Sequence, residues 1–442
     1  MRPIIGARST ELFIWTHRLN DVEPIEPIVP TVPAVPLIRP LRGLLPAPQY
    51  AGQVAAPPYD VLSSAEARAL ATGNPLSFLH VSKAEIDLAE DTDPHDPAVY
   101  AKARGNLDAL IGREILHRDS APALYIYRMT HGEHRQTGLV ATASIAAYES
   151  QRIRRHELTR PDKEDDRVHH MDALNAQTGP VLMAYPTDSE VDAALRHAST
   201  AMPLLDVRAA TGVRHEIWAM RDPAWHGRMV NLFERLPNLY IADGHHRSAA
   251  AARVARARRG RPVSDSHEYF LVVAFPQQQL RILDYNRVVS DLNGLTPSQF
   301  LQRLQDRFQV TRCAEPVGPR LPGEFGVYLR EGWFLLRVDP RHVPADPVGA
   351  LDVSVLSSLV LAPILGITDV RRDPRIDFIG GIRGLSSLQE RVDSGSAAAA
   401  FSLCPTRMAD LMAVADAGEI MPPKSTWFEP KLADGLVSHV LD

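Results

Sequence analysis

The segment from Leu239 to Arg247 says more about the fold and function of this chain than any other part of its sequence. An apolar run ends in Asp243 and Gly244, and two histidines and an arginine follow. The apolar run predicts a buried strand, and the Ala- and Arg-rich residues 248–258 predict a helix. The first turn of a helix has free N–H groups and a partial positive charge, which suit an anion such as phosphate. The sequence therefore predicts chemistry where this strand meets this helix.

The bulk properties limit the class of protein. The 442 residues exceed the usual size of one hydrophobic core, so two or three domains are expected. The net charge of −5 argues against a general nucleic-acid binder. The two cysteines, Cys313 and Cys404, cannot form a four-cysteine zinc site, and they fit a reducing, cytoplasmic compartment. No apolar stretch is long enough to span a bilayer, and no signal peptide is recognisable, so no membrane association is expected.

The order of the predicted elements indicates the fold class. Strands and helices follow each other without regular alternation, which predicts an α+β fold rather than a doubly wound sheet. Residues 22–48 are rich in proline, which predicts an extended, poorly packed segment. The expected organisation is a proline-rich extension, an N-terminal α+β domain, a core domain with the reactive groups and a C-terminal α+β domain, at residues 1–37, 38–150, 151–295 and 296–442.

Local signals place several elements within this organisation. Ser63 is predicted to cap a helix that runs through Thr72, with Glu66 in the capping-box position. Further helices are predicted at residues 98–111, 190–199 and 224–236. Alternating apolar residues predict two pairs of strands, at 124–128 with 138–148 and at 269–275 with 280–289.

A second polar cluster runs from Arg152 to His170 and is dense in histidine, arginine and carboxylates. One interpretation is a plain solvated segment. The arginines and histidines also suit phosphate binding, and an ionised Glu157 could accept a proton from a substrate hydroxyl. Five further side chains are candidates for substrate binding, namely His156, Thr159, Arg160, Lys163 and Arg167.

A third candidate is the segment from Met421 to Lys431, where Lys424, Ser425 and Thr426 follow two prolines. The triplet is similar in composition to the end of a phosphate loop, although the glycines of a Walker A motif are missing. Two interpretations stay open: a lysine that reaches nucleotide phosphates, and a proline-rigid closing segment with buried aromatic residues.

Other chemistries find less support in the sequence. There is no G-x-S-x-G motif for a serine hydrolase and no G-x-G-x-x-G motif for a Rossmann cofactor. A zinc site could draw on His169, His170, His245 and His246. Adjacent histidines on a strand or helix point apart, however, and neither pair has the spacing that places two imidazoles on one helix face.

Several segments in a fixed order resemble the bacterial and archaeal proteins grouped as domain of unknown function 1015. The resemblance runs from about Ile38 to the end of the chain, and the family name implies no function. The segments that carry it are AAPPYDV, NPLSFLH, RHELTRPDKEDDR, YIADGHHR and PPKSTWFEPK, at residues 55–61, 74–80, 155–167, 240–247 and 422–431.

The Asp-Gly-His-His-Arg box is also similar to that of the ParB/sulfiredoxin superfamily, which includes kinases of free L-serine. This resemblance implies a ParB/sulfiredoxin-like core with a mixed sheet and flanking α/β elements. It implies a phosphotransferase that uses ATP or ADP with Mg²⁺ and acts on L-serine or a similar small hydroxyl substrate. The resemblance implies catalytic roles for Glu157 as the base and for Asp243, His245 and His246, with Asp243 holding the metal. The residues implied to bind nucleotide are Gly244, His245, His246, Arg247, Lys424, Ser425 and Thr426.

Two alternative functions stay open. One is a ParB-like regulator that binds CTP and associates with DNA, which the acidic net charge and the lack of a recognisable helix-turn-helix count against. The other is a metal-dependent phosphatase or hydrolase that uses the same histidines and carboxylates.

Overall fold

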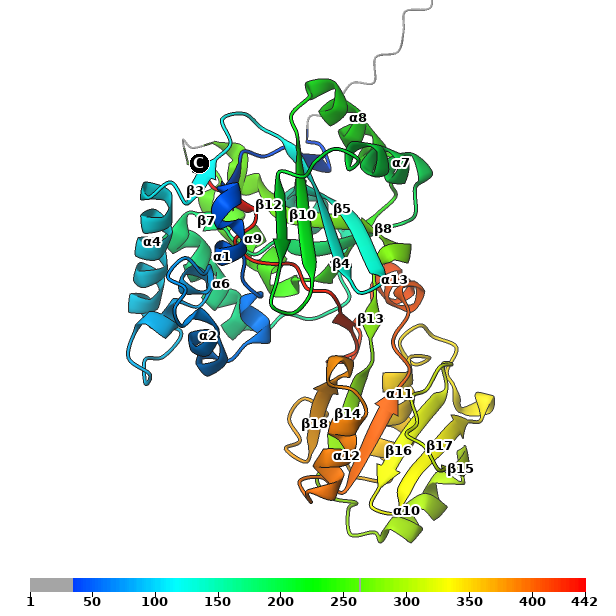
Figure 1. The fold of residues 1–442 in the computed structure, drawn as a ribbon. Helices are drawn as coiled ribbons and strands as arrows, with labels where there is room; N and C mark the ends of the chain where they lie inside the picture. Colours follow the sequence, from blue (N-terminus) through cyan, green and yellow to red (C-terminus); the bar gives the residue numbers. More distant parts are fainter. Residues whose placement is uncertain (1–34, 262–263) are drawn as a thin grey trace, which may run out of the picture.

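Two lobes joined at a narrow waist make up the molecule (Figure 1). A computed structural model describes residues 35–261 and 264–442. It contains helices together with mixed and antiparallel sheets, so the predicted α+β class is confirmed. The ParB/sulfiredoxin-like core stays a prediction. Most of the extension predicted at residues 1–37 lies outside the described residues.

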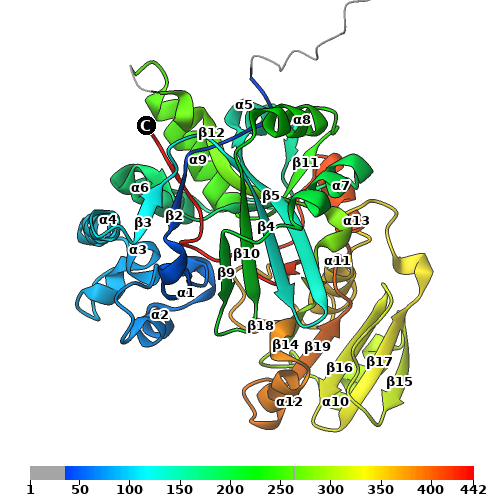
Figure 2. The same cartoon turned by 45° about the horizontal axis from the view of Figure 1, so that its top comes forward.

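The large lobe is built on a nine-stranded mixed sheet (Figure 2). Its strand order is β6-β11-β8-β12-β5-β4-β10-β9, and β1 also pairs with β5. The pairs β6–β11 and β8–β12 are parallel, and the other neighbours are antiparallel. The strands are β1 (Ile38–Arg39), β4 (Leu124–His131), β5 (His134–Ser144), β6 (Ile153–Arg154), β8 (Val181–Tyr185), β9 (Leu205–Arg208), β10 (Arg214–Met220), β11 (Leu239–Asp243) and β12 (Tyr269–Pro276).

Alternate residues of β12 contribute to two hydrophobic cores. Phe270 and Val272 face a core whose helical residues come mainly from four helices, whereas Leu271 and Val273 face a core on the other side of the sheet. Successive strand residues point to opposite faces, so a strand buried on both sides is apolar throughout, as β12 is. The four helices are α5 (Ile145–Glu149), α7 (Ser189–Ala198), α8 (Pro223–Glu234) and α9 (His245–Arg258).

A helical group packs beside this sheet around a third core. Its helix α2 begins with the predicted capping box of Ser63 and Glu66. A four-stranded sheet of order β3-β2-β21-β7 completes the group. The elements are α1 (Ala51–Val54), α2 (Ser64–Ala71), α3 (Leu79–Ser82), α4 (Pro97–Gly112), α6 (Pro161–Leu174), β2 (Gly43–Pro46), β3 (Leu116–Arg118), β7 (Ala176–Gln177) and β21 (Ser438–Val440).

The end of the proline-rich segment is well packed, which corrects the expectation of poor packing across residues 22–48. Ile38 lies in β1 and Leu44 in β2, and both are buried. Pro40 and Pro46 fall just after or at the end of these strands, where a missing N–H donor costs little. Apolar residues between the prolines therefore fill the core. Residues 22–34 lie outside the described part of the chain.

The small lobe is a six-stranded antiparallel sheet of order β15-β17-β16-β19-β14-β18 with short helices. Its elements are β14 (Tyr285–Val289), α10 (Pro297–Leu304), β15 (Phe308–Cys313), β16 (Glu324–Leu329), β17 (Gly332–Val338), α11 (Asp352–Leu356), β18 (Ile376–Gly380), α12 (Ser386–Asp393) and β19 (Ala399–Leu403).

The chain passes between the lobes several times. The chain enters the small lobe through β13 (Ile282–Leu283) and leaves it before α13 (Met408–Asp416). After α13 it forms β20 (Trp427–Phe428), which pairs with β13 at the waist (Figure 1), and it ends in the large lobe, where β21 pairs with β2 and β7. The domain boundary expected at residue 150 therefore falls within one sheet, and the small-lobe sheet begins before residue 296.

Two strand expectations need correction. The strand predicted at 138–148 ends at Ser144, whose side chain accepts a hydrogen bond from the N–H of Ala147 and caps α5. The segments 269–275 and 280–289 do not pair, because β12 lies in the large sheet and β14 in the small lobe. A local helix cap decided the first outcome, and pairing between distant strands decided the second. Within the described residues, no helix combines the length and the apolar character needed to cross a bilayer.

Buried histidines predict acid instability. Burial lowers the pKa of His156, His170, His215 and His439 from 6.5 to about 4. Their unfolded forms bind protons at a higher pH than their folded forms, so stability falls as the pH drops from 6.5 towards 4. Asp434, whose pKa burial raises to about 7, acts with the opposite sign, but the histidines outnumber it. We expect a lower urea midpoint at pH 5 than at pH 7.

His215 offers the control for this prediction, because its Nδ1 lies 2.8 Å from the hydroxyl of Tyr127. His215→Gln keeps a hydrogen-bonding side chain and removes one titrating group, so the difference between the two pH values should shrink. Equal midpoints at pH 7 and pH 5 for the native sequence would contradict the expected role of the histidines.

Candidate active site

Two parallel strands bring the predicted clusters together. In β6 and β11, Ile153 lies opposite Leu239 and Arg154 opposite Tyr240. Parallel neighbours end at the same edge of a sheet, so residues 155–157 and residues 243–245 emerge side by side. The sequence does not specify this pairing, because about 85 residues separate the two strands. The parallel pairing of β6 with β11 is therefore what assembles the site.

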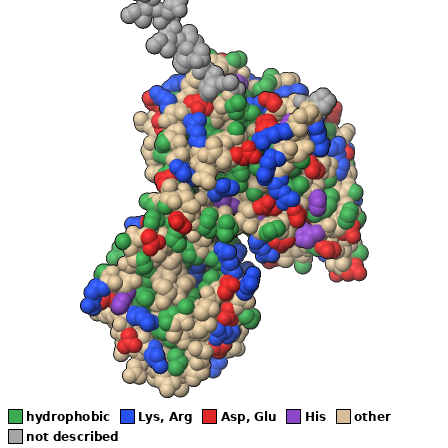
Figure 3. All heavy atoms as spheres, turned by 180° about the vertical axis from the view of Figure 1, so that it is seen from behind, with side chains coloured by type: hydrophobic (Ala, Val, Ile, Leu, Met, Phe, Trp, Pro, Cys, Tyr) green, Lys and Arg blue, Asp and Glu red, His purple; other side chains and the backbone are tan. Residues whose placement is uncertain are grey.

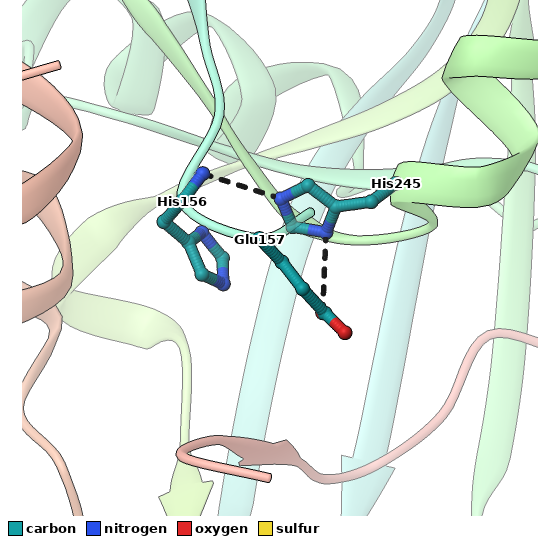
Figure 4. Close-up of side chains that lie close together, drawn as sticks. All are labelled: His156, Glu157 and His245. Atoms are coloured by element: carbon teal, nitrogen blue, oxygen red, sulfur yellow. Dashed lines mark hydrogen bonds and ion pairs between the residues drawn. The ribbon is translucent and has the colours of Figure 1, made fainter. Parts of the chain in front are cut away.

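His156, Glu157 and His245 form a compact cluster at this edge (Figure 4). The backbone N–H of His156 donates to Nε2 of His245 at 3.4 Å, and Nδ1 of His245 lies 3.7 Å from Oε2 of Glu157. The two imidazole rings meet edge-to-face, with their centroids 4.4 Å apart. Both histidines are buried, whereas the Glu157 side chain is 48% exposed. The Glu157 side chain is therefore accessible to water, whereas both imidazole rings are shielded from it.

The surroundings keep both histidines neutral. Burial lowers the pKa of His156 to about 4, against small opposing effects of the Ile241 backbone and of Asp243. Burial, together with the neighbouring His156, lowers the pKa of His245 well below its usual value. Burial and the negative charge of Asp243 raise the pKa of Glu157. A carboxylate with a raised pKa is a stronger proton acceptor.

Gly244 makes the turn that joins β11 to α9. Its φ of 106° lies in the left-handed region, which side chains other than hydrogen disfavour. A Cβ atom here would lie 3.1 Å from Nε of Arg247 and 3.3 Å from Cα of Val181. No side chain caps the helix that follows, so the first-turn N–H groups stay available to an anion.

Replacing Gly244 by alanine should destabilise the protein by about 1–3 kcal/mol, because a side chain is strained at this φ and meets Arg247. Gly260→Ala is a matched control, since Gly260 has φ +81° but nothing within 4 Å of an added Cβ. Urea unfolding should show the larger loss for Gly244→Ala. Equal losses would mean that backbone strain alone, without the contact to Arg247, sets the cost.

Arg247 is closed off from solvent and holds the turn together. Its guanidinium donates to the carbonyl of Pro180 and lies 3.6 Å from carboxylate oxygens of both Asp60 and Asp243. Its side chain is 6% exposed. Asp434 lies in the same buried group, and burial raises its pKa to about 7. Arg247 is thus placed to support the Asp-Gly turn rather than to touch a ligand.

Asp243 has two cationic partners. Lys431 donates to its Oδ2 at 3.0 Å, and Arg247 lies near its Oδ1. Burial acts to raise the pKa of Asp243, but the charges of Lys431 and Arg247 outweigh it and hold the pKa well below its usual value. A magnesium ion at Asp243 would have to compete with these two fixed cations, so the carboxylate does not fit the metal role that the resemblance implied.

A cavity of about 190 Å³ opens beside the cluster. Arg155, Glu157, Thr159 and His245 line one side of it, and the chain after α13 closes the other. Arg155 stacks on the ring of Tyr148 at 4.9 Å, which orients its charge. The volume lies below the roughly 300 Å³ typical of drug-sized ligands, so it suits a small molecule.

Basic side chains surround this region, and the view from behind shows lysines and arginines on both lobes close to the waist (Figure 3). The positive charges of Lys424, Arg371 and Lys431 all act to lower the pKa of Glu157, which places them within electrostatic range of it. Arg371 belongs to the small lobe, so both lobes contribute charge to the site.

Two predicted substrate residues, Thr159 and Arg160, lie on the segment that leads from this cluster into α6, and a third, Lys163, lies in the first turn of α6. The backbone N–H of Arg160 donates to Nε2 of His246 at 3.1 Å, while the Arg160 side chain pairs with Asp162. The hydroxyl of Thr159 donates to Glu164. Lys163 is exposed on α6. These contacts fix the loop, and Arg154 and Arg155 are the arginines that line the cavity.

Arg167 does not join the cluster. It pairs with Asp166 at 2.6 Å and lies over the ring of Tyr59, 3.9 Å from its centroid. Its side chain is 10% exposed. The structure thus places this predicted substrate residue in the packing between α6 and residues 59–61.

The C-terminal loop approaches the site from the waist. The N–H of Met421 donates to the carbonyl of His156 at 2.8 Å, which ties the loop to the cluster. Lys424 is exposed and lies within electrostatic range of Glu157. Ser425 is buried, and its hydroxyl donates to the carbonyl of Pro422. Ser425 therefore supports the loop, and no contact brings Thr426 to the cluster within the described residues.

Sequence reasoning missed several residues of this site. Asp60, Arg155 and Lys431 all belong to segments that resembled the family, so their place in those segments was the available signal. Asp434 and Arg371 carry no such signal. The return of the C-terminal segment brings Asp434 close to Arg247, and the position of the small lobe brings Arg371 within electrostatic range of Glu157.

Comparison with known protein families identifies the family of this chain. The chain matches the family described as "Protein of unknown function (DUF1015)" over residues 38–354, and it belongs to that family. No curated protein matches it.

Weak similarities connect the chain to solved structures. A free serine kinase mutant in complex with AMP has 12% identity and a TM-score of 0.34, over 65% of this chain and 86% of that one. A conserved hypothetical protein from Pyrococcus furiosus has 12% identity and a TM-score of 0.32, over 67% and 93%. SbnI with a C-terminal truncation, from Staphylococcus aureus, has 13% identity and a TM-score of 0.34, over 67% and 85%.

Proposed function

We propose that this protein is a phosphotransferase that moves a phosphoryl group from a nucleotide, ATP or ADP, to the hydroxyl of a small acceptor such as L-serine. One observation carries the proposal. The half-exposed carboxylate of Glu157 lies 3.7 Å from the first residue of an uncapped helix, beside a small cavity and within range of three cations.

The donor phosphates fit the amino end of α9. The first-turn N–H groups of this helix have no side-chain cap, and the helix dipole favours negative charge there. The exposed Lys424 and the Asp243-bound Lys431 add positive charge, and His246 is partly exposed on the same turn. Phosphoryl transfer depends mainly on positioning and charge neutralisation, which such a surface supplies.

The acceptor fits the cavity beside Glu157. The carboxylate can take the proton of a hydroxyl as it attacks phosphorus, and its raised pKa favours this role. Arg155 is placed to bind a carboxylate or another anionic group of the acceptor, since it lines the same cavity in a fixed orientation. A small anionic hydroxyl compound satisfies both contacts.

The proposed roles of the box residues differ from one another. Asp243 positions Lys431, and Arg247 positions the Gly244 turn. His245 contacts Glu157, and His246 holds the backbone of Arg160. We assign no residue of this chain to Mg²⁺, because Asp243 is already balanced by two cations.

A nucleotide panel tests the proposal. Purified protein is incubated with ATP, ADP or CTP and Mg²⁺, with and without L-serine and other small hydroxy acids, and phosphorylated product is followed by ³¹P NMR. We expect product that requires both ATP or ADP and an acceptor. Nucleotide binding without any acceptor-dependent product would contradict the phosphotransferase. CTP-specific binding that depends on DNA would favour the regulatory alternative.

A further inference from the structure

We propose that His156, Glu157 and His245 form a binding site for a divalent transition-metal ion of the zinc class. Each residue offers one ligand atom, and these atoms all lie within 4.8 Å of one another. The proposal goes beyond the phosphotransferase and does not depend on it. It also uses a set of ligands that differs from the Asp243 site expected from sequence.

The donor set selects the metal. Two imidazoles and one carboxylate suit zinc, cobalt, iron and similar ions, whereas magnesium prefers oxygen ligands and water. A histidine that binds a metal must be neutral, and burial of both rings disfavours their charged forms.

His156 supplies an observation that points independently to a ligand. Its side chain is buried, and within the described residues neither ring nitrogen makes a hydrogen bond of normal geometry, although the Ile241 backbone lies near the ring. An imidazole buried without partners is costly, because it has lost water and gained nothing in exchange. One of its nitrogens faces Glu157 and His245 (Figure 4), where a metal ion would satisfy it.

The spacing fits a metal after a small contraction. Ligand atoms about 2.0–2.1 Å from a tetrahedral zinc lie roughly 3.4 Å from each other. Nδ1 of His245 and Oε2 of Glu157 are already 3.7 Å apart. The half-exposed Glu157 side chain can move towards the two rings, and the rings themselves must close any gap that remains between them. The His156 backbone N–H donates to Nε2 of His245, which places the proton of the neutral ring on Nδ1. Metal binding at Nδ1 therefore moves this proton to Nε2 and breaks the long 3.4 Å hydrogen bond.

The fourth position of the metal would open onto the cavity. Glu157 and His245 line this cavity, so a metal between them would be accessible to water or to a small ligand. Three protein ligands with one open position are typical of exchangeable or catalytic sites rather than structural ones. When the metal is bound, the carboxylate of Glu157 is engaged as a ligand and cannot also serve freely as a base.

Metal titration without nucleotide tests the site. Untagged, metal-free protein is titrated with Co²⁺, followed by visible absorption, and with Zn²⁺, followed by calorimetry. We expect one equivalent of each metal to bind, with the intense visible bands of tetrahedral Co²⁺. His156→Ala should weaken binding by at least about 100-fold, as removing one of three ligands does. His197→Ala, at an exposed histidine of α7, is the matched control and should bind normally.

Glu157→Gln keeps the test decisive if His156→Ala fails to fold, because the exposed side chain is not needed for packing. It should also weaken Co²⁺ binding and change the visible spectrum. The proposal is overturned if the native protein binds no Co²⁺ or Zn²⁺, or if both site variants bind like His197→Ala. Phosphotransfer with Mg²⁺ as the only added metal is scored separately, so each hypothesis can fail alone.

Discussion

Glu157→Gln is expected to lower acceptor-dependent phosphoryl transfer by about 10²–10⁴-fold, the usual contribution of a general base. The amide cannot accept the proton of the attacking hydroxyl, although it has nearly the same shape. Nucleotide affinity should change little, because the donor phosphates are proposed to bind at the amino end of α9 and not at this carboxylate. Steady-state rates and calorimetric titration with the nucleotide measure the two quantities.

The matched control is Glu133→Gln, at an exposed glutamate in the turn between β4 and β5. It should retain the full rate. The raised pKa of Glu157 adds a second test, since the rate should fall with decreasing pH as this carboxylate becomes protonated. Unchanged turnover in Glu157→Gln would remove this residue from the mechanism.

Arg247→Ala is expected to lower the free energy of unfolding by about 3–5 kcal/mol, because it removes the cation from a buried ionic group. Asp60 and Asp243 would each lose a positive partner, and the carbonyl of Pro180 would lose its donor. The strained turn at Gly244 would also lose the side chain that packs against it. Urea unfolding and calorimetric melting should both show the loss.

Arg228→Ala is the control, because Arg228 is an exposed arginine on a helix of the same lobe. Its melting temperature should match that of the native protein. If Arg247→Ala instead melts normally and only loses nucleotide affinity, then Arg247 contacts the ligand, as the sequence resemblance implied, and its positioning role is wrong.

Much of the local structure was predictable because it depends on neighbouring residues. The capping box at Ser63 and the helix over residues 97–112 follow from side chains a few positions apart. The strand that ends at Asp243 and the helix that begins at His245 were predicted for the same reason. The two segments at 269–275 and 280–289 were wrongly paired, since each strand found a distant partner that local alternation cannot specify.

The candidate site was also predictable only in part from its sequence. The sequence indicated Glu157 and the Asp-Gly-His-His-Arg box, because such polar groups have little use in a packed core. It could not separate the role of His245 from that of Arg247, which lies two residues further along. The first turn of α9 directs His245 to the cavity and Arg247 into the interior, where two carboxylates meet it.

Residue types and short spacings were enough to predict the α+β character, the glycine turn before the helix and the family of the chain. Long-range packing set β6 parallel to β11, returned Lys431 to Asp243 and left His156 without a hydrogen bond of normal geometry beside Glu157. Those contacts join segments about 85 to 190 residues apart. Their energies come from packing and charge pairing that no local pattern encodes.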